Sequence, residues 1–309
     1  MHLPEHFVIH PAIQEALRNK LPIVALESAV ITHGLPRPVN LELARQMEDI
    51  IISENVVPAT IAMIDGKIHI GLSAQELEEL SNRDGTRKIS RRDFGFAIAN
   101  HLSGGTTVAG TMVAAHQAGI RVFATGGIGG VHRGSQWDIS ADLPELGKTP
   151  MIVVCAGAKA ILDLPATLEY LETMGVLVVG YRTDDFPAFY SYSSGLHLDA
   201  RADAPADIVK MAKAQWNLGF TNAILVVQPP PPGTEIPNQV IEKIIEDAVA
   251  EAHKQHISGP AVSPFLLEKV KTLTGGESMA TNLALLKNNA SLAAQIANEM
   301  NGKGIGRLI

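Results

Sequence analysis

Lys159 is the residue whose position most clearly indicates chemistry. It follows residues 151–155, an apolar segment whose length and β-branched content predict a buried parallel strand. Small residues form a turn at 156–158, and Asp163 is the predicted N-cap of the next helix. Open α/β sheets bind their ligands at this end of a strand, and the apolar surroundings reduce the hydration that keeps an amine charged. We interpret Lys159 as a nucleophile, and the alternative is a surface lysine whose stem covers Ile161.

Glu27 holds a similar position after a second predicted strand, residues 22–26. The segment that follows, 29–40, contains breakers at Gly34, Pro36 and Pro38, and it is predicted to be a loop. Asn40 is the predicted N-cap of the next helix, which extends to about residue 55. A carboxylate at a strand end could act as an acid or base. A solvated or capping acid is the alternative.

Oxygen-bearing side chains alternate at Asp138, Ser140 and Asp142, after a glycine-rich segment at 126–134. Such oxygen ligands suit a hard cation, Mg²⁺ or Mn²⁺, although Asp142 could instead cap the following turn. The glycines do not complete a dinucleotide fingerprint and no helix is predicted after them, so we reject NAD binding.

Four cations, Lys88 among them, lie between residues 87 and 92. Near a strand end they could clamp one phosphate group, and the Gly-Gly-Thr-Thr turn at 104–107 opens a helix whose N–H groups suit an anion. The alternatives are a solvated turn with ion pairs to Asp84 and Asp93, and a simple helix cap at Thr106.

The predicted elements alternate in the order of an α/β protein with a mainly parallel sheet. A hairpin is predicted around Asp65-Gly66, and the C-terminal section is helical. Asn282 lies near the start of its last helix, where capping is the alternative to a functional role. Further predicted helices are at 11–20, 40–55, 204–218, 237–256, 263–273 and 278–300, with strands at 176–181, 196–201 and 223–227.

The composition favours a free small molecule as partner. The net charge of -7 lacks the basic surplus of nucleic-acid-binding proteins. The single cysteine, Cys155, argues against disulfides, and no apolar run reaches the roughly 18 residues of a membrane helix. We expect a soluble, cytoplasmic protein with neither nucleic-acid nor membrane partners.

Several longer motifs occur together and carry a resemblance. They are ALESAVITHGLP (25–36), MIDGKIHIGL (63–72), KISRRD (88–93), SGGTTV (103–108), GGIGGVHRGSQWDISADL (126–143), CAGAKAILDLPATLEYLET (155–173) and SPFLLEKV (263–270). Through these motifs the chain resembles the pseudouridine-5′-phosphate glycosidase family, also called the indigoidine-synthase-A-like family.

The resemblance implies an α/β/α sandwich forming a single domain over residues 1–309, a homotrimer and a divalent metal, usually Mn²⁺. It also implies an enzyme of nucleotide metabolism that reversibly cleaves pseudouridine 5′-phosphate to uracil and ribose 5-phosphate. By resemblance Lys159 is the nucleophile, Glu27 the acid/base and Asp138 the metal ligand. The substrate contacts that it implies are Lys88, Val108, Ser140, Ala141, Asp142 and Asn282.

A C–C bond to uracil lacks the easy exit of an N-glycosidic bond, so covalent catalysis by an amine would divide the barrier. We hypothesise that Glu27, with a raised pKa, protonates the ribose ring oxygen while Lys159 adds at C1′ and later forms a Schiff base. Two alternatives remain. One is a class-I aldolase-type lyase acting on a phosphorylated sugar, and the other is a non-catalytic accessory protein in pigment synthesis.

Overall fold

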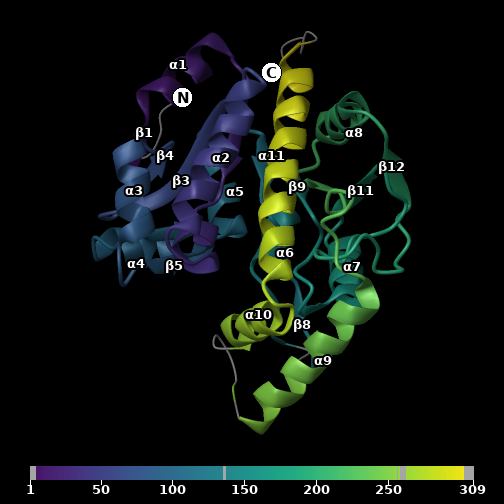
Figure 1. Ribbon diagram of the computed structural model, residues 1–309. Coiled ribbons are helices and arrows are strands. Elements are labelled where there is room, and N and C mark those ends of the chain that lie inside the picture. The colour runs from purple at the N-terminus through teal and green to yellow at the C-terminus, as the bar shows by residue number, and fades with distance from the viewer. Residues whose placement is uncertain (1–4, 135–136, 256, 258–261, 303–309) are drawn as a thin grey trace.

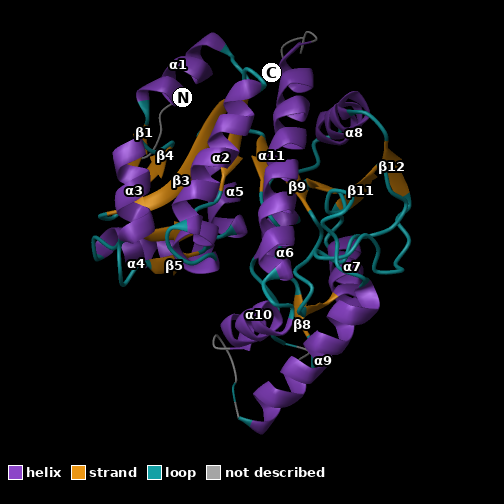
Figure 2. Cartoon of the chain, viewed as in Figure 1, coloured by secondary structure: helices purple, strands orange, loops and turns teal. Residues whose placement is uncertain are grey.

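The computed structural model describes residues 5–134, 137–255, 257 and 262–302. One large mixed sheet of eleven strands is flanked by helices, as Figures 1 and 2 show, and β8 and β10 form a separate two-stranded sheet. The expected α/β fold with a mainly parallel sheet is confirmed. In the described part of the chain, no helix combines the length and the apolar character that crossing a membrane requires.

The elements have the following bounds. The strands are β1 (Phe7–Ile9), β2 (Ile23–Leu26), β3 (Val57–Ile64), β4 (Lys67–Ile70), β5 (Arg87–Ile89), β6 (Gly104–Thr106), β7 (Val122–Ala124), β8 (Val131–His132), β9 (Ile152–Cys155), β10 (Leu162–Asp163), β11 (Leu177–Tyr181), β12 (Ala200–Ala202) and β13 (Ile224–Val227). The helices are α1 (Pro11–Asn19), η1 (Val30–Gly34), α2 (Val39–Ser53), α3 (Ala74–Asn82), η2 (Arg91–Asp93), α4 (Phe94–Ala99), α5 (Val108–Gln117), α6 (Asp142–Leu146), α7 (Leu164–Thr173), α8 (Pro205–Asn217), α9 (Asn238–Lys254), α10 (Val262–Leu273) and α11 (Glu277–Gly302).

The centre of the large sheet consists of five neighbouring parallel strands, in the order β2, β7, β9, β13 and β11. Every residue of β2, β9 and β13 is buried, which explains their continuous apolar sequences. The register pairs Leu26 with Ala124, Ala124 with Val154, and Cys155 with Val227. The residues that follow these strands therefore lie in a row along one edge of the sheet.

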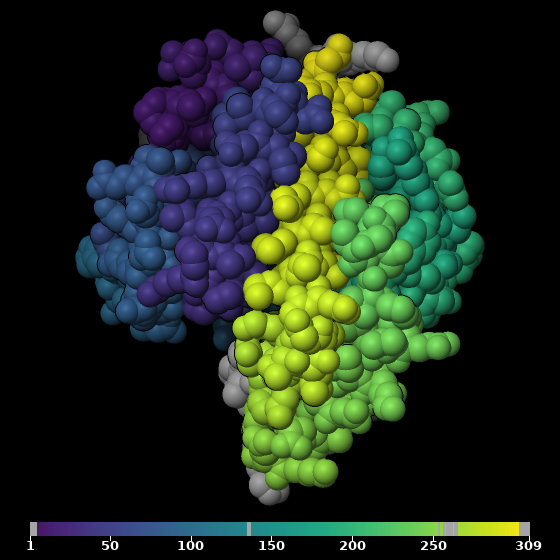
Figure 3. All heavy atoms as spheres, viewed as in Figure 1, coloured from purple at the N-terminus to yellow at the C-terminus, as the bar shows by residue number. Residues whose placement is uncertain are grey.

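Helix α11 covers this central part of the sheet. It packs on β2, β7 and β9 and lies between α2 and α8, and Figures 1 and 3 show it as the yellow helix along the middle of the molecule. Burying one leucine or isoleucine side chain contributes about 1.5–3 kcal/mol, so its apolar face holds it firmly on the strands. The buried apolar stripe of α11 comprises Leu285, Leu286, Ala290, Leu292, Ala293 and Ile296.

The predicted hairpin is confirmed. Strands β3 and β4 are antiparallel, and Asp65 and Gly66 connect them with φ angles of 46° and 78°. Both angles lie in the left-handed region that a type I′ turn requires, which is why an Asp-Gly pair predicts this turn well.

The segment 29–40 differs from the predicted loop because Val30–Gly34 forms a π-helix, η1. Asn40 is also not the cap of α2. Its buried side chain lies inside the helix and donates to the carbonyl oxygens of Ile31 and Ser81. Tertiary contacts across α2 and α3 therefore use the amide that the sequence suggested for a local cap.

Two smaller predictions also need correction. The N-cap of α5 is Thr107, whose side chain accepts from the Gly110 N–H, because Thr106 is the last residue of β6. The strand predicted at 196–201 is shorter and later, since only Ala200–Ala202 pairs with β11.

Candidate functional site

Glu27 and Lys159 lie on the same edge of the sheet. Glu27 directly follows β2, Lys159 follows β9 after the turn at 156–158, and β7 is the strand between them. The positive charge of Lys159 is the strongest charge acting on Glu27, and the charges of Asp142 and Lys88 also act on it. The structure thus brings together four predicted residues from distant segments, which we call the charged cluster: Glu27, Lys88, Asp142 and Lys159.

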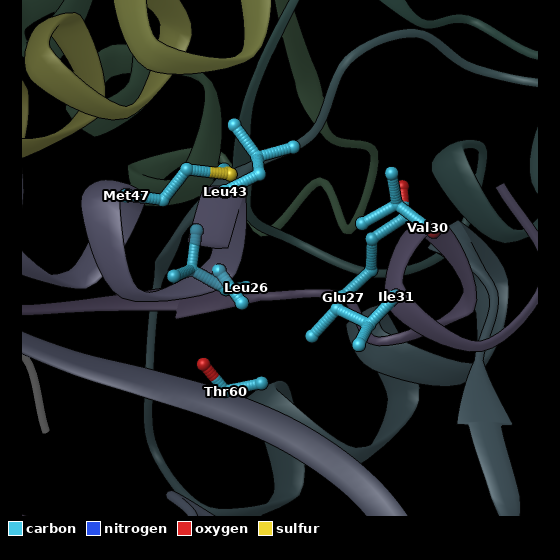
Figure 4. A pocket seen from close by; sticks show the side chains of 8 residues that line it. Leu26, Glu27, Val30, Ile31, Leu43, Met47 and Thr60 are labelled. Carbon is cyan, nitrogen blue, oxygen red and sulfur yellow. The ribbon is translucent and has the colours of Figure 1, made fainter. Parts of the chain in front are cut away.

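The Glu27 side chain lies against an apolar wall. Burial raises the pKa of its carboxyl group, and although the Lys159 charge and a hydrogen bond from the Thr125 hydroxyl oppose this, the net direction is upward. Glu27 therefore keeps its proton to a higher pH than an ordinary glutamate does. A cavity of about 10 Å³, with room for one water at most, adjoins it. This cavity is too small for a nucleotide and is lined by Leu26, Glu27, Val30, Ile31, Leu43, Ala44, Met47 and Thr60 (Figure 4).

Ser28, the residue after Glu27, ties this part of the backbone to the neighbouring strands β3 and β6. Ser28 is buried, and its hydroxyl donates to the Ile61 carbonyl oxygen at 2.6 Å and accepts from the Thr106 N–H at 3.0 Å. The Ser28 carbonyl oxygen also accepts two backbone N–H groups of η1, both at 3.0 Å. Single π-helical turns are rare and are often found at functional sites, and here the turn anchors the residue that follows the strand.

Asp142 is buried, and backbone N–H groups hold both of its carboxylate oxygens. Ala109 donates to Oδ1 at 2.9 Å, and Gly129 donates to Oδ2 at 2.8 Å. Val108, the first residue of α5, is buried directly beside Ala109. The carboxylate therefore joins the start of α5 to the glycine-rich segment, rather than only capping its own turn.

Ser140 and Ala141 lead into α6 at the same contact. The Ser140 hydroxyl oxygen accepts from the Asp142 N–H at 3.3 Å. A Cβ atom at position 129 would lie 2.2 Å from the Ser140 hydroxyl oxygen and 2.9 Å from the Asp142 Oδ2. Glycine is therefore required at 129 for these two side chains to keep their positions.

Lys88 reaches the charged cluster from β5, where it pairs with Gly105 of β6. Although much of this residue is exposed, partial burial lowers the pKa of its ammonium group and the Lys159 charge lowers it further. The charges of Glu27 and Asp142 oppose both effects. Lys88 therefore lies within electrostatic range of the other three members of the cluster.

The backbone around Lys159 is tightly held. Its N–H donates to the Ile128 carbonyl oxygen at 3.1 Å, and its own carbonyl oxygen accepts from the Leu162 N–H at 2.9 Å. Gly157 has a φ of 85°, and a Cβ atom there would lie 2.6 Å from the Pro187 carbonyl oxygen. The expected strand, turn and lysine are confirmed, and Lys159 is only partly exposed.

Asp138 lies opposite β8. Its Oδ2 atom is 3.9 Å from the His132 Nδ1 atom, and its side chain is 48% exposed. Among the described residues, no group of three or more His, Cys, Asp or Glu side chains forms a metal cage. One carboxylate still fits a hard cation that keeps most of its water ligands. An open hollow of about 690 Å³ lies beside His132, and its lining, which includes Asp163 and Glu169, contains no member of the charged cluster.

Three buried polar residues that the sequence reasoning missed support the same edge of the sheet. Thr125 follows β7 and donates its hydroxyl to Glu27. Asn289 of α11 donates to the Thr125 carbonyl oxygen at 2.8 Å, and Gln228, which follows β13, donates to the Asn289 Oδ1 atom at 2.9 Å. The sequence does contain a signal for Asn289, because this residue interrupts the apolar stripe of its helix. A buried amide requires hydrogen-bond partners, so its presence there indicates a specific polar contact. Asn282, in contrast, is half-buried and lies within α11, so it is not a cap.

Comparisons with known proteins show the family of this chain. Residues 12–299 match the family model described as indigoidine synthase A like protein. A pseudouridine-5′-phosphate glycosidase from Geobacillus kaustophilus is 52% identical, over 96% of this chain and 99% of its own length. Another protein of that name, from Dinoroseobacter shibae, is 53% identical over 96% of this chain and 98% of its own length.

Two solved structures are similar along almost the whole chain. The prealnumycin C-glycosynthase AlnA, in complex with ribulose 5-phosphate, has a TM-score of 0.91 and 37% identity, and the match covers 97% of this chain and 98% of that one. An indigoidine synthase A-like protein from Thermotoga maritima has a TM-score of 0.89 and 35% identity, covering 97% and 99%. With motifs, fold and relatives in agreement, the chain belongs to the indigoidine synthase A-like family.

Proposed function

We propose that this chain is an enzyme that reversibly cleaves the C–C glycosidic bond of pseudouridine 5′-phosphate, giving uracil and ribose 5-phosphate. The observation that carries the proposal is the charged cluster, in which an acid with a raised pKa lies near an amine at the edge of a parallel sheet. The names of the curated relatives support the substrate, and the ribulose 5-phosphate bound to AlnA supports a sugar phosphate.

The reaction begins with the neutral amine of Lys159 bonding to C1′ of the ribose. Glu27 gives its proton to the ring oxygen as the C1′–O4′ bond breaks, which leaves an open-chain sugar attached to the lysine nitrogen. The attached nitrogen then loses a proton to the Glu27 carboxylate, and its lone pair forms an iminium with C1′ while the C1′–C5 bond breaks. The electron pair of that bond stays on C5 of uracil, which takes up a proton, and water hydrolyses the iminium to release ribose 5-phosphate and the free amine.

The other predicted residues are proposed to position the substrate. Lys88 supplies positive charge for the phosphate, near the N-terminal end of α5 at Val108, where an anion is favourable. Ser140, Ala141 and Asp142, at the turn into α6, are proposed to contact the substrate directly. Asn282 completes the set of proposed substrate contacts. Thr106 is not included, because its hydroxyl and N–H groups are used within the protein.

We also propose that Asp138 holds a divalent cation, Mn²⁺ in the first instance. A single half-exposed carboxylate fits an ion that keeps water ligands, and such an ion would supply positive charge for the phosphorylated substrate. Isothermal titration of the metal-free protein with Mn²⁺ tests this, with Asp138→Asn expected to abolish binding. The family resemblance further supports a homotrimer, which sedimentation equilibrium would measure.

The decisive experiment compares Lys159→Ala with the wild type in the release of uracil from pseudouridine 5′-phosphate. We expect turnover to fall by at least a thousandfold or so, because the covalent route is lost, while the melting temperature and ligand binding stay close to those of the wild type. Lys210→Ala, which removes an exposed lysine of α8, is the matched control. Near-normal activity of Lys159→Ala would falsify the mechanism.

The same measurement separates the rival functions. A class-I aldolase-type lyase would be trapped by borohydride with an aldehyde or ketone substrate and would not require uracil. An accessory protein would bind the ligand without releasing uracil. Release of uracil by the wild type and not by Lys159→Ala excludes both.

A further inference from the structure

Hydrogen bonds connect Gln228 to Asn289, Asn289 to the backbone of Thr125, and the Thr125 hydroxyl to Glu27. The Gln228 amide donates to Asn289 at 2.9 Å, the Asn289 amide donates to the Thr125 carbonyl oxygen at 2.8 Å, and the Thr125 hydroxyl donates to the Glu27 carboxyl group. We call these three residues the polar brace. Gln228 directly follows β13, Thr125 directly follows β7, and Asn289 lies in α11, so three separate parts of the fold support one carboxyl group.

The polar brace is buried in an otherwise apolar region. Asn289 and Thr125 are fully buried and Gln228 is 6% exposed. A buried amide without a partner destabilises the fold, so an apolar residue at 289 would suffice for a packing role alone. The amide of Asn289 is explained by its hydrogen bond to the Thr125 carbonyl oxygen.

Asn289 holds a backbone that is fixed from its other side as well. The Thr125 N–H donates to the Val154 carbonyl oxygen at 3.0 Å, and a Cβ atom on Gly126 would lie 3.1 Å from the Leu286 Cδ2 atom. Helix α11 therefore packs directly against residues 125 and 126. With its N–H and carbonyl groups both paired, the backbone of Thr125 is fixed, and this sets the position from which its hydroxyl reaches Glu27.

We propose that Asn289, supported by Gln228, is a positioning residue that holds Thr125 so that its hydroxyl donates to the Glu27 carboxyl group. One oxygen of Glu27 then accepts this hydrogen bond and the other carries the proton for the substrate. The proposal rests on the proposed function, because it gives the acid of that reaction its orientation.

The brace also acts on the pH dependence of the acid. The Thr125 hydrogen bond lowers the pKa of Glu27 and so do the Lys159 and Lys88 charges, whereas burial and the Asp142 charge raise it. Losing the hydrogen bond therefore raises the pKa of Glu27. The pH limb on which activity requires protonated Glu27 should then move to higher pH.

The test is a double-mutant cycle between Asn289→Leu and Thr125→Val. Each change keeps the approximate volume and removes the polar group. We expect each to lower kcat about tenfold with KM within about twofold, and to move that pH limb upward. Because both act through one hydrogen bond, Asn289→Leu should have no further effect in the Thr125→Val background.

Asn298→Leu is the matched control. Asn298 lies on the same helix and also donates to a backbone carbonyl oxygen, that of Glu54 at 2.7 Å, away from the charged cluster. It should lower the melting temperature without moving the pH limb. If Asn289→Leu does not fold, Gln228→Met weakens the brace from its other end and should move the limb in the same direction.

The pKa of Glu27 can be measured without substrate, so this proposal can be tested independently of the proposed function. The Glu27 carboxyl resonance can be titrated by ¹³C NMR, with Glu27→Gln to assign it. An upward shift of its midpoint in Asn289→Leu supports the brace even if pseudouridine 5′-phosphate is not the substrate. An unchanged midpoint, or independent additive losses in the cycle, would overturn the brace even if the wild type releases uracil.

Discussion

Arg91 donates two hydrogen bonds from one nitrogen, Nη1, to both carboxylate oxygens of Glu145, at 3.0 and 2.9 Å. The Glu145 side chain is 1% exposed, whereas that of Arg91 is 53% exposed. Arg91 follows Lys88 by three residues, and Glu145 follows Asp142 by three. The pair therefore links the two segments that carry opposite charges of the cluster.

Replacing Arg91 by methionine should loosen that link. Glu145 would stay buried with a hydrogen bond from Thr149 at 2.5 Å and the Lys148 ammonium at 3.3 Å. Since the arginine is half exposed, we expect a loss of about 1–2 kcal/mol in the free energy of unfolding, measured by urea denaturation, together with a raised KM. Arg92→Met, at a side chain that is 90% exposed, should change neither quantity.

Glu27→Gln should abolish turnover and yet stabilise the fold as the pH rises. Below pH 4.5, the ordinary value for glutamate, the carboxyl group is protonated in both states. Between 4.5 and the raised pKa of the folded protein, unfolding releases a proton, so the stability of the wild type falls with rising pH. The melting temperature of Glu27→Gln should therefore exceed that of the wild type by an increasing margin across this window. If the melting temperature of the wild type instead rises relative to that of Glu27→Gln as the pH increases, the pKa of Glu27 is depressed in the folded protein.

Gly129→Ala should impair activity more than most single-methyl additions. The new Cβ atom would lie 2.2 Å from the Ser140 hydroxyl oxygen and 2.9 Å from Asp142, so both side chains must move. We expect kcat/KM to fall by about a hundredfold, since small displacements of positioning groups are costly. Gly95→Ala in α4 is the matched control, because no atom lies within 4 Å of its added Cβ, and it should gain about 0.5–1 kcal/mol in stability. Equal activity losses in the two variants would contradict the assignment of this turn.

Lys88→Met should reduce the preference for a phosphorylated substrate. If Lys88 contacts the phosphate, the wild type should use unphosphorylated pseudouridine poorly, and the variant should lose kcat/KM on pseudouridine 5′-phosphate by about tenfold to a hundredfold. Activity on pseudouridine itself should change little. Kinetics on the two compounds side by side give the ratio of their kcat/KM values. If Lys88→Met leaves this ratio unchanged, Lys88 does not contact the phosphate.

Local patterns in the sequence predicted much of the fold because short-range physics determines those features. The Asp65-Gly66 hairpin, the Asp163 cap and the buried strand before Lys159 each depend on a few neighbouring residues. Glu27 and Lys159 could be found because residues that follow parallel strands share one edge of the sheet.

The rest depends on contacts between distant parts of the chain. The π-helix after Glu27 is preceded by Ser28, whose side chain bonds to β3 and β6, and no local window contains these contacts. Asn40 resembled a cap but bonds across α2 and α3, and Asn289 appeared as one polar residue in an apolar stripe. Their roles follow from strand order and helix docking, which the residues alone did not specify.

Helix α11 is the last described element of the chain. It packs on β2, β7 and β9, the strands that precede Glu27, Thr125 and Lys159. During synthesis on the ribosome this helix emerges after everything it covers. A growing chain can thus assemble its sheet and still lack the contact from Asn289 to the Thr125 backbone until α11 has docked. The proposed acid and amine would then gain their final support in one late folding step.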